Sequence, residues 1–225
     1  MNTSIFSVSG PVMIGPSSSH TAGAAKLARV AREIVAEPFT HVSFGLHGSF
    51  AKTYKGHGTD KALVAGALGY KEDDERLADS FGLAQEAGLS YDFHEVELEG
   101  VHENTVKITF TLENGKTKTI IGSSIGGGQI LIRQINGYDV EFDASSPTLI
   151  IHHQDQVGVI TNLTKVLSDH NVNIAIMKLS RKAKGGKAFC ILEIDGCISD
   201  EVVEEIQNLP HLLEVERIQV GECTQ

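Results

Sequence analysis

The last third of this 225-residue chain alternates strand and helix patterns in an order that few folds accept. Strand patterns at 148–153, 172–182, 187–194 and 212–220 are interrupted by helical patterns at 157–167 and 200–209. The turn Lys184-Gly185-Gly186 joins the two middle strands as a hairpin. The order βαββαβ within about seventy residues is typical of the split βαβ, ferredoxin-like arrangement. We therefore predict a separate domain of this architecture over 148–221.

The N-terminal part is predicted to form a mixed α/β domain over 1–145, which places the whole chain in the α+β class. Helical patterns lie at 22–35, 62–68 and 73–87, and a strand pattern lies at 41–46. From residue 91 the periodicity indicates antiparallel strands at 91–96, 106–112, 117–121 and 130–135. The segment Ala144-Ser145-Ser146-Pro147 is typical of a boundary between domains.

Charge and hydropathy exclude several classes of partner. Asp and Glu number 29 against 19 Lys and Arg, and the net charge of −10 argues against binding to nucleic acid or anionic membranes. No apolar run is long enough to span a bilayer, and the first residues do not have the pattern of a signal peptide. We expect a cytoplasmic protein that has neither nucleic acid nor membrane as a partner.

The densest group of polar side chains precedes the first helix, in the run Gly15-Pro16-Ser17-Ser18-Ser19-His20-Thr21-Ala22-Gly23. The first amides of a helix lack intrahelical acceptors, and the helix dipole there favours an anion. We predict a carboxylate or phosphate site that uses the hydroxyls of Ser17, Ser18, Ser19 and Thr21. The alternative is an ordinary N-cap by Ser19 or Thr21. A cap needs one hydroxyl, whereas this run offers four.

Two more polar loops accompany predicted elements. His47-Gly48-Ser49 follows the first strand, and Gly56-His57-Gly58-Thr59-Asp60 precedes a helix that Thr59 or Asp60 would cap. The ordinary pKa of imidazole permits proton transfer near neutrality, so His20, His47 and His57 are candidate bases. A structural hydrogen bond is the alternative for each histidine, and the sequence does not rank the three.

The run Ser123-Ser124-Ile125-Gly126-Gly127-Gly128 interrupts the predicted sheet. Three consecutive glycines add nothing to strand packing, which indicates main chain brought close to another surface or to a ligand.

The three cysteines, Cys190, Cys197 and Cys223, are scattered over the last third of the chain. Iron–sulfur clusters and structural zinc sites usually draw on closely paired cysteines. We therefore predict no metal ligands in this chain.

The C-terminal unit resembles an ACT domain, a ferredoxin-like module that pairs edge to edge and binds small amino acids at the seam. The matching residues are His153-Gln154-Asp155-Gln156-Val157-Gly158-Val159-Ile160 and Val172-Asn173-Ile174. The resemblance implies an effector site in which His153, Asp155, Gly158 and Asn173 hold an amino acid. A fold used only for dimerisation is the alternative.

The chain as a whole resembles the β chain of the bacterial two-chain, iron–sulfur-dependent L-serine dehydratase. The resemblance rests on four motifs in order, which begin at Gly15, His47, Gly56 and Ser123, and it continues through the ACT unit. It implies a carbon–nitrogen lyase that converts L-serine to pyruvate and ammonia. A partner α chain then ligates the [4Fe-4S] cluster, which agrees with the cysteine spacing of this chain.

The same resemblance implies how the chain takes part. Catalysis would draw on His57, His20 and His47, and the substrate L-serine would contact Ser17, Ser18, Ser19, Thr21, Ser49, Thr59 and Gly127. Homodimerisation through the ACT domain or the N-terminal domain is implied as well.

A similar N-terminal fold occurs as the allosteric substrate-binding domain of some phosphoglycerate dehydrogenases, which add a nicotinamide-binding domain. This chain has no Gly-x-Gly-x-x-Gly after a strand. The alternative function is a stand-alone amino-acid-binding regulator of the ACT type. Histidines in three loops favour the enzyme, because a passive carboxylate sensor would not need them.

Overall fold

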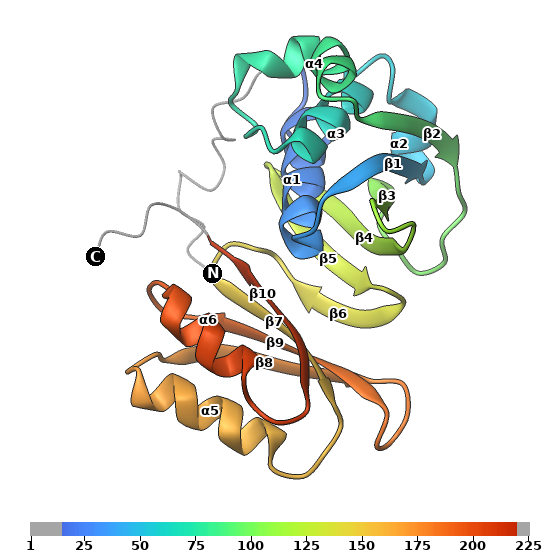
Figure 1. The fold of residues 1–225 in the computed structure, drawn as a ribbon. Coiled ribbons are helices and arrows are strands. Elements are labelled where there is room, and N and C mark those ends of the chain that lie inside the picture. The colour runs from blue at the N-terminus through green and yellow to red at the C-terminus, as the bar shows by residue number, and fades with distance from the viewer. Residues whose placement is uncertain (1–14, 220–225) are drawn as a thin grey trace, which may run out of the picture. The chain divides into compact units, whose positions relative to one another are not determined.

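The computed structural model describes residues 15–219 and contains two compact units, which divide between Gly137 and Tyr138 (Figure 1). The predicted boundary segment 144–147 therefore lies inside the second unit. No helix among the described residues is both long and apolar enough to cross a bilayer. Each unit is mixed α and β, which confirms the predicted fold class.

The first unit starts with one π-helical turn that leads directly into an α-helix. Its elements are η2 (Ser18–Ala22), α1 (Gly23–Val35), β1 (Phe39–Leu46), α2 (Gly48–Thr53), α3 (Thr59–Leu68), the 3₁₀ helix η3 (Glu75–Asp79), α4 (Ser80–Glu86), β2 (Ser90–Glu95), β3 (Thr105–Leu112), β4 (Thr117–Gly126) and β5 (Gln129–Ile135). Its five strands lie in the order β2-β1-β3-β4-β5. Alternate residues in the second half of β1, Val42, Phe44 and Leu46, are buried.

Helices α1 and α3 pack closely because small residues face each other between them. A Cβ atom at Gly66 of α3 would lie 2.2 Å from the carbonyl oxygen of Ala25 and 2.8 Å from the Cβ of Ala28. Only glycine allows this approach. The contact holds the two helices together, and α3 also contacts η2, so the start of α3 lies beside the polar motifs.

Three features of this unit differ from the sequence prediction. Strand β2 pairs with β1 in parallel rather than antiparallel fashion. The predicted helix over 73–87 is divided into η3 and α4, and the Asp74 side chain caps η3 by accepting from the Arg76 amide at 3.0 Å. The glycine run does not interrupt the sheet. Instead, β4 extends to Gly126, and Gly127 and Gly128 form the two-residue turn to β5 with positive φ.

The second unit opens with β6 (Tyr138–Phe142) and continues with β7 (Thr148–Gln154), α5 (Val159–Asp169), β8 (Ile174–Arg181), β9 (Lys187–Ile194), α6 (Asp200–Gln207) and β10 (Leu212–Ile218). Its four-stranded sheet has the order β10-β7-β9-β8, and α5 and α6 cover one face (Figure 1). Leu149, Leu163, Leu192 and Ile206 share the core between sheet and helices. The predicted βαββαβ order over β7 to β10 is therefore confirmed.

Candidate functional site

The predicted polar motifs of the first unit meet around His20, which lies in η2. The Nε2 atom of His20 is 3.1 Å from the Ser49 hydroxyl at the start of α2. The His20 ring lies edge-on to the buried Phe50 ring, with centroids 5.3 Å apart, and 4.9 Å from the ring centroid of His57. Segments from three separate parts of the sequence thus surround one imidazole.

The hydroxyls near His20 have different partners. Ser17 is the N-cap of η2, and its Oγ accepts from the His20 amide at 3.1 Å. Thr21 is buried and donates its hydroxyl to the main-chain carbonyl of His57 at 3.1 Å. Ser18 and Ser19 remain half-buried at the start of the helix, and the Ser19 Oγ lies 3.5 Å from Nδ1 of His20. The N-cap is thus Ser17, and not Ser19 or Thr21 as the capping alternative expected. The hydroxyls of Ser18 and Ser19 do not cap the helix and can serve a ligand.

A π-helical turn sets the direction of the His20 side chain. The amide of Gly23 donates to the carbonyl of Ser18, five residues back, instead of four as in an α-helix. Such turns are rare and are frequently found at functional sites. The wider turn lets the His20 ring reach Ser49 while α1 continues with regular geometry.

Ser124 is a further polar residue of this site that the sequence analysis did not single out. It is fully buried on β4, and a Cβ atom at Gly23 would lie 2.0 Å from its Oγ. This Oγ has no hydrogen-bond partner among residues 15–219. Its motif was recognised, but the approach of β4 to the first residue of α1 is a tertiary contact that local sequence does not encode.

His57 and Thr59 lie at the start of α3. The Nδ1 atom of His57 is buried and finds no partner within the described part of the chain, and the same is true of the Thr59 hydroxyl. The N-cap of α3 is Gly58, with φ of +67° and no side-chain cap, instead of the predicted Thr59 or Asp60. His57 therefore presents a buried, unused ring nitrogen close to His20.

His47 and Gly127 have structural explanations of their own. The Leu98 amide donates to Nδ1 of His47 at 3.2 Å, so this ring fastens the segment that follows β2. Gly127 belongs to the turn between β4 and β5, where φ is +60° and glycine is favoured. The structure thus brings His20, Ser49, Thr21 and His57 together. His47 and Gly127 have structural roles instead, in a loop contact and in a turn.

Burial and charge favour the neutral form of His20. Its pKa is lowered from the ordinary value of 6.5, first by burial and second by the neighbouring His57. A neutral imidazole has one unprotonated ring nitrogen and can accept a proton. The pair His20 and Ser49 therefore has the composition of a general base held in place by a hydroxyl.

The described residues do not form a metal site. No group of three or more His, Cys, Asp or Glu side chains among residues 15–219 is placed to hold an ion. Cys190 is buried in the core of the second unit, and burial raises its pKa to about 12. Cys223 lies outside the described residues. An iron–sulfur cluster does not fit the described residues of this chain.

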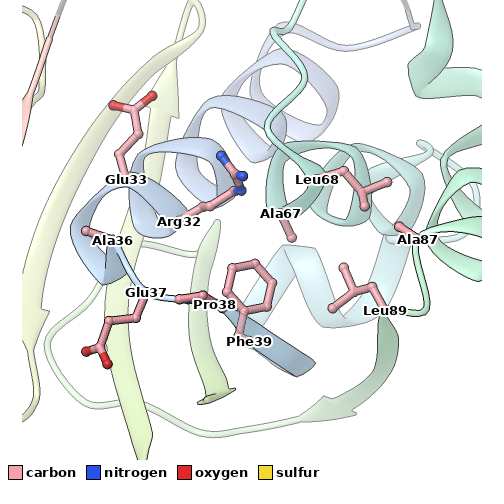
Figure 2. Close-up of a pocket in the computed structure, with 10 residues that line it drawn as sticks. All are labelled: Arg32, Glu33, Ala36, Glu37, Pro38, Phe39, Ala67, Leu68, Ala87 and Leu89. Carbon is pink, nitrogen blue, oxygen red and sulfur yellow. The ribbon is translucent and has the colours of Figure 1, made fainter. Parts of the chain in front are cut away.

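A large cavity of about 590 Å³ lies at the opposite end of α1 from His20 (Figure 2). Residues from the end of α1, the start of β1, the end of α3 and the segment after α4 line it. Its carboxylates are already paired, Glu33 with Arg29 at 2.7 Å and Glu37 with Lys118 at 3.0 Å. A helix of thirteen residues is about 20 Å long, so this cavity is remote from the polar motifs.

The second unit places three of the four predicted effector residues at one end of its sheet. His153 is the last residue but one of β7 and is 2% exposed, Asp155 directly follows the strand, and Gly158 is the N-cap of α5 with φ of +93°. Asn173 precedes β8, which runs parallel to β7, so Asn173 lies at the other end of the sheet, where it donates to Asp195 at 2.6 Å. One chain therefore does not bring Asn173 to the other three.

Comparison with known proteins first defines the class. Residues 4–87 match the family model described as serine dehydratase beta chain, and residues 147–211 match the model of the ACT domain. The chain is thus a two-unit protein whose second unit is an ACT domain.

Full-length relatives then define the family. The chain is 42% identical to the L-serine dehydratase beta chain of Peptoniphilus asaccharolyticus, with 96% of this chain and 98% of that one covered. It is 39% identical to a probable L-serine dehydratase beta chain of Bacillus subtilis, with 96% and 97% covered. It therefore belongs to the family of L-serine dehydratase β chains. A D-3-phosphoglycerate dehydrogenase of B. subtilis is 30% identical over 87% of this chain but only 37% of its own length.

Proposed function

We propose that this chain combines with an α chain to form an L-serine dehydratase, which deaminates L-serine to pyruvate and ammonia. The observation that carries the proposal is the hydrogen-bonded pair His20 and Ser49, with His57 beside it, at the start of α1. Full-length similarity to named β chains of this enzyme supports the same conclusion.

Loss of water and ammonia from serine begins with removal of the proton on its α carbon. His20 is our candidate for this base, because its lowered pKa keeps a ring nitrogen free to accept the proton near neutrality. The Ser49 hydroxyl holds the ring in position. His57 is our candidate to pass the proton onward, because its ring centroid lies 4.9 Å from that of His20 and its buried Nδ1 has no partner among residues 15–219.

The substrate carboxylate is proposed to lie at the start of η2. Here the helix dipole favours a negative charge, and the half-buried hydroxyls of Ser18 and Ser19 can donate to it. Thr59 and Ser124 offer further buried hydroxyls in the same region. This arrangement orients the α carbon toward His20.

Departure of the serine hydroxyl needs help that this chain's described residues do not supply. The absence of a ligand set among residues 15–219 supports assigning the [4Fe-4S] cluster to the α chain. The present chain then accounts for binding the substrate and for moving its proton.

We also propose that two copies of this chain pair along β8, which is an edge strand of the second unit. Its side chains Ile176 and Leu179 are 42% and 55% exposed. Exposed apolar side chains on an edge strand invite pairing with another strand.

A second candidate function is regulation by an amino acid at the ACT unit. The Nε2 atom of His153 is buried without a partner in the described part of the chain, and α5 begins at a glycine that offers no side-chain cap. Both features favour an effector at this loop. The enzyme and the regulator hypotheses separate when the chain is mixed anaerobically with the α chain, because only the first expects pyruvate.

The decisive experiment is turnover of the assembled enzyme with His20→Asn, measured together with the cluster absorbance. General base catalysis contributes roughly a hundredfold to ten-thousandfold, so kcat should fall by that factor while the spectrum is retained. His41→Asn is the matched control, because the His41 side chain is also hydrogen-bonded but lies on β1, away from the site around His20. Undiminished turnover of the His20 variant would refute the proposed mechanism.

A further inference from the structure

The loop after β7 is fastened to the β8–β9 hairpin by a set of hydrogen bonds. The Asp155 carboxylate accepts from the Arg181 guanidinium at 2.6 Å and from the Gly185 amide at 3.0 Å. The Asp155 amide donates to the Gly186 carbonyl at 2.8 Å, and the Gln154 side chain donates to the Gly185 carbonyl at 2.5 Å. We call the Asp155–Arg181 pair the clip.

The residues beside the clip offer groups for a small zwitterion. Nδ1 of His153 faces the carbonyl of Gln154 at 2.9 Å and must donate to it, so Nε2 of the neutral ring is left as an acceptor. This Nε2 is buried without a partner in the described residues, and its residue is 2% exposed. The Val159 amide donates to the Gln156 carbonyl at 3.4 Å, whereas the next amides of the first turn of α5 have no acceptor within the helix. A Cβ atom at Gly158 would meet nothing within 4 Å.

We propose that Arg181 is the gating residue of the effector site: its guanidinium occupies Asp155 in the free chain, and an α-amino acid opens the clip by placing its ammonium there. This inference rests on the effector site proposed above. Arg181 thus competes with the effector for Asp155 and does not itself hold the effector.

The exposure of the pair makes such an exchange feasible. The side chains of Asp155 and Arg181 are 25% and 54% exposed, and ion pairs of this kind contribute little to stability because water screens them. A bound amino acid replaces the guanidinium with its own ammonium and adds two contacts that Arg181 cannot make. Its carboxylate can accept hydrogen bonds from the unpaired amides in the first turn of α5, and a side-chain hydroxyl can donate to Nε2 of His153.

The chemistry of the site therefore selects the ligand class. A simple carboxylate has no ammonium to displace Arg181 from Asp155, and a simple amine would leave the α5 amides without an anion. A small α-amino acid with a hydroxyl satisfies all three groups.

The test measures L-serine binding to the full chain by calorimetry and follows by hydrogen exchange the Gly185 amide, which donates to the same Asp155 carboxylate. In Arg181→Met the competitor is gone, so the apparent Kd for L-serine should fall roughly threefold to tenfold, a factor equal to the reciprocal of the fraction of wild-type chains that are open. In the wild type, L-serine should speed exchange of the Gly185 amide. Asp155→Asn should raise the Kd about tenfold or more, because the ammonium loses its charged partner.

Arg76→Met is the matched control, because Arg76 is 59% exposed and pairs with an aspartate in the first unit. It should leave the Kd unchanged. Ethanolamine and lactate, each carrying half of the zwitterion, should bind much more weakly than L-serine.

The outcomes separate the clip from the site on which it rests. Weaker or unchanged binding in Arg181→Met, with Asp155→Asn still impaired, would overturn the gating role and leave the effector site standing. Exchange of the Gly185 amide that does not change when L-serine binds would likewise overturn the gating role. If Asp155→Asn binds L-serine normally, the site itself is elsewhere and the proposal fails with it. Neither result bears on turnover of the assembled enzyme, which tests His20 independently.

Discussion

The hydroxyl of Thr21 donates to the main-chain carbonyl of His57 at 3.1 Å, across 36 positions of sequence. Through this bond the first turn of the helical region holds the loop before α3. His20, adjacent to Thr21, and the His57 ring then come within 4.9 Å of each other, measured between centroids. The geometry of the two imidazoles thus depends on a buried hydroxyl that takes no part in proton transfer.

Replacing Thr21 with valine keeps the shape of the side chain and removes this donor. The carbonyl of His57 then lacks a buried partner, so the free energy of unfolding should fall by about 1–3 kcal/mol. Turnover should fall as well, because the His57 loop is no longer fixed. Urea denaturation and kcat of the assembled enzyme measure the two effects.

Thr164→Val provides the comparison for this experiment. The Thr164 hydroxyl donates to the Ile160 carbonyl within α5 of the second unit, at 2.9 Å. This control should leave kcat unchanged. A Thr21→Val chain that is as stable and as active as the wild type would contradict the role assigned to the bond.

A second prediction concerns the pair His170 and Glu205, which links the end of α5 to α6 at 2.7 Å. The hydrogen bond to Glu205 raises the pKa of His170 above its ordinary value of 6.5. The folded chain therefore binds this proton more tightly than the unfolded chain. The stabilisation is fully present below 6.5 and is lost as the pH rises through the raised value.

We expect Glu205→Gln to lower the free energy of unfolding at about pH 5.5 and to have a smaller effect at about pH 9, where His170 has lost its proton and Glu205 no longer faces a cation. Urea titrations at the two pH values measure the difference. Glu204→Gln is the control, because it makes the same charge change on the same helix. A loss from Glu205→Gln that is equal at both pH values would disprove the linkage.

The elements of the second unit could be predicted because each has its own periodic apolar pattern. Strand β9 was expected at its observed bounds, and α5 and β8 each begin two residues later than expected, since patterns do not encode where a loop ends. In the first unit, α2 could not be predicted because it has only six residues and begins at a glycine, Gly48. The parallel pairing of β2 with β1 depends on a connection of more than forty residues, which local sequence does not specify.

In the candidate site, too, the local motifs could be predicted and the tertiary contacts could not. The motifs around His20, Ser49 and His57 could be found because hydroxyls and histidines in loops are conspicuous. Their partners could not be predicted, since they depend on tertiary contacts. Examples are the Leu98 amide that donates to His47 and the Ser124 hydroxyl beside Gly23. A serine in a strand and a histidine in a loop give no local sign of which neighbours they will meet.

The last prediction tests the electrostatic coupling of the two imidazoles. The pKa of His20 is lowered by burial and, to a smaller extent, by repulsion from His57. His57→Gln removes the repulsion, so the pKa of His20 should rise toward its ordinary value. If neutral His20 is the base, the acidic limb of the pH profile of kcat/KM must move to higher pH in this variant, whatever its residual rate. His41→Gln should leave the limb in place, because His41 bonds to Asp92 and Ser90 instead. A limb that stays fixed in His57→Gln would mean that the group titrating in the free enzyme is not His20.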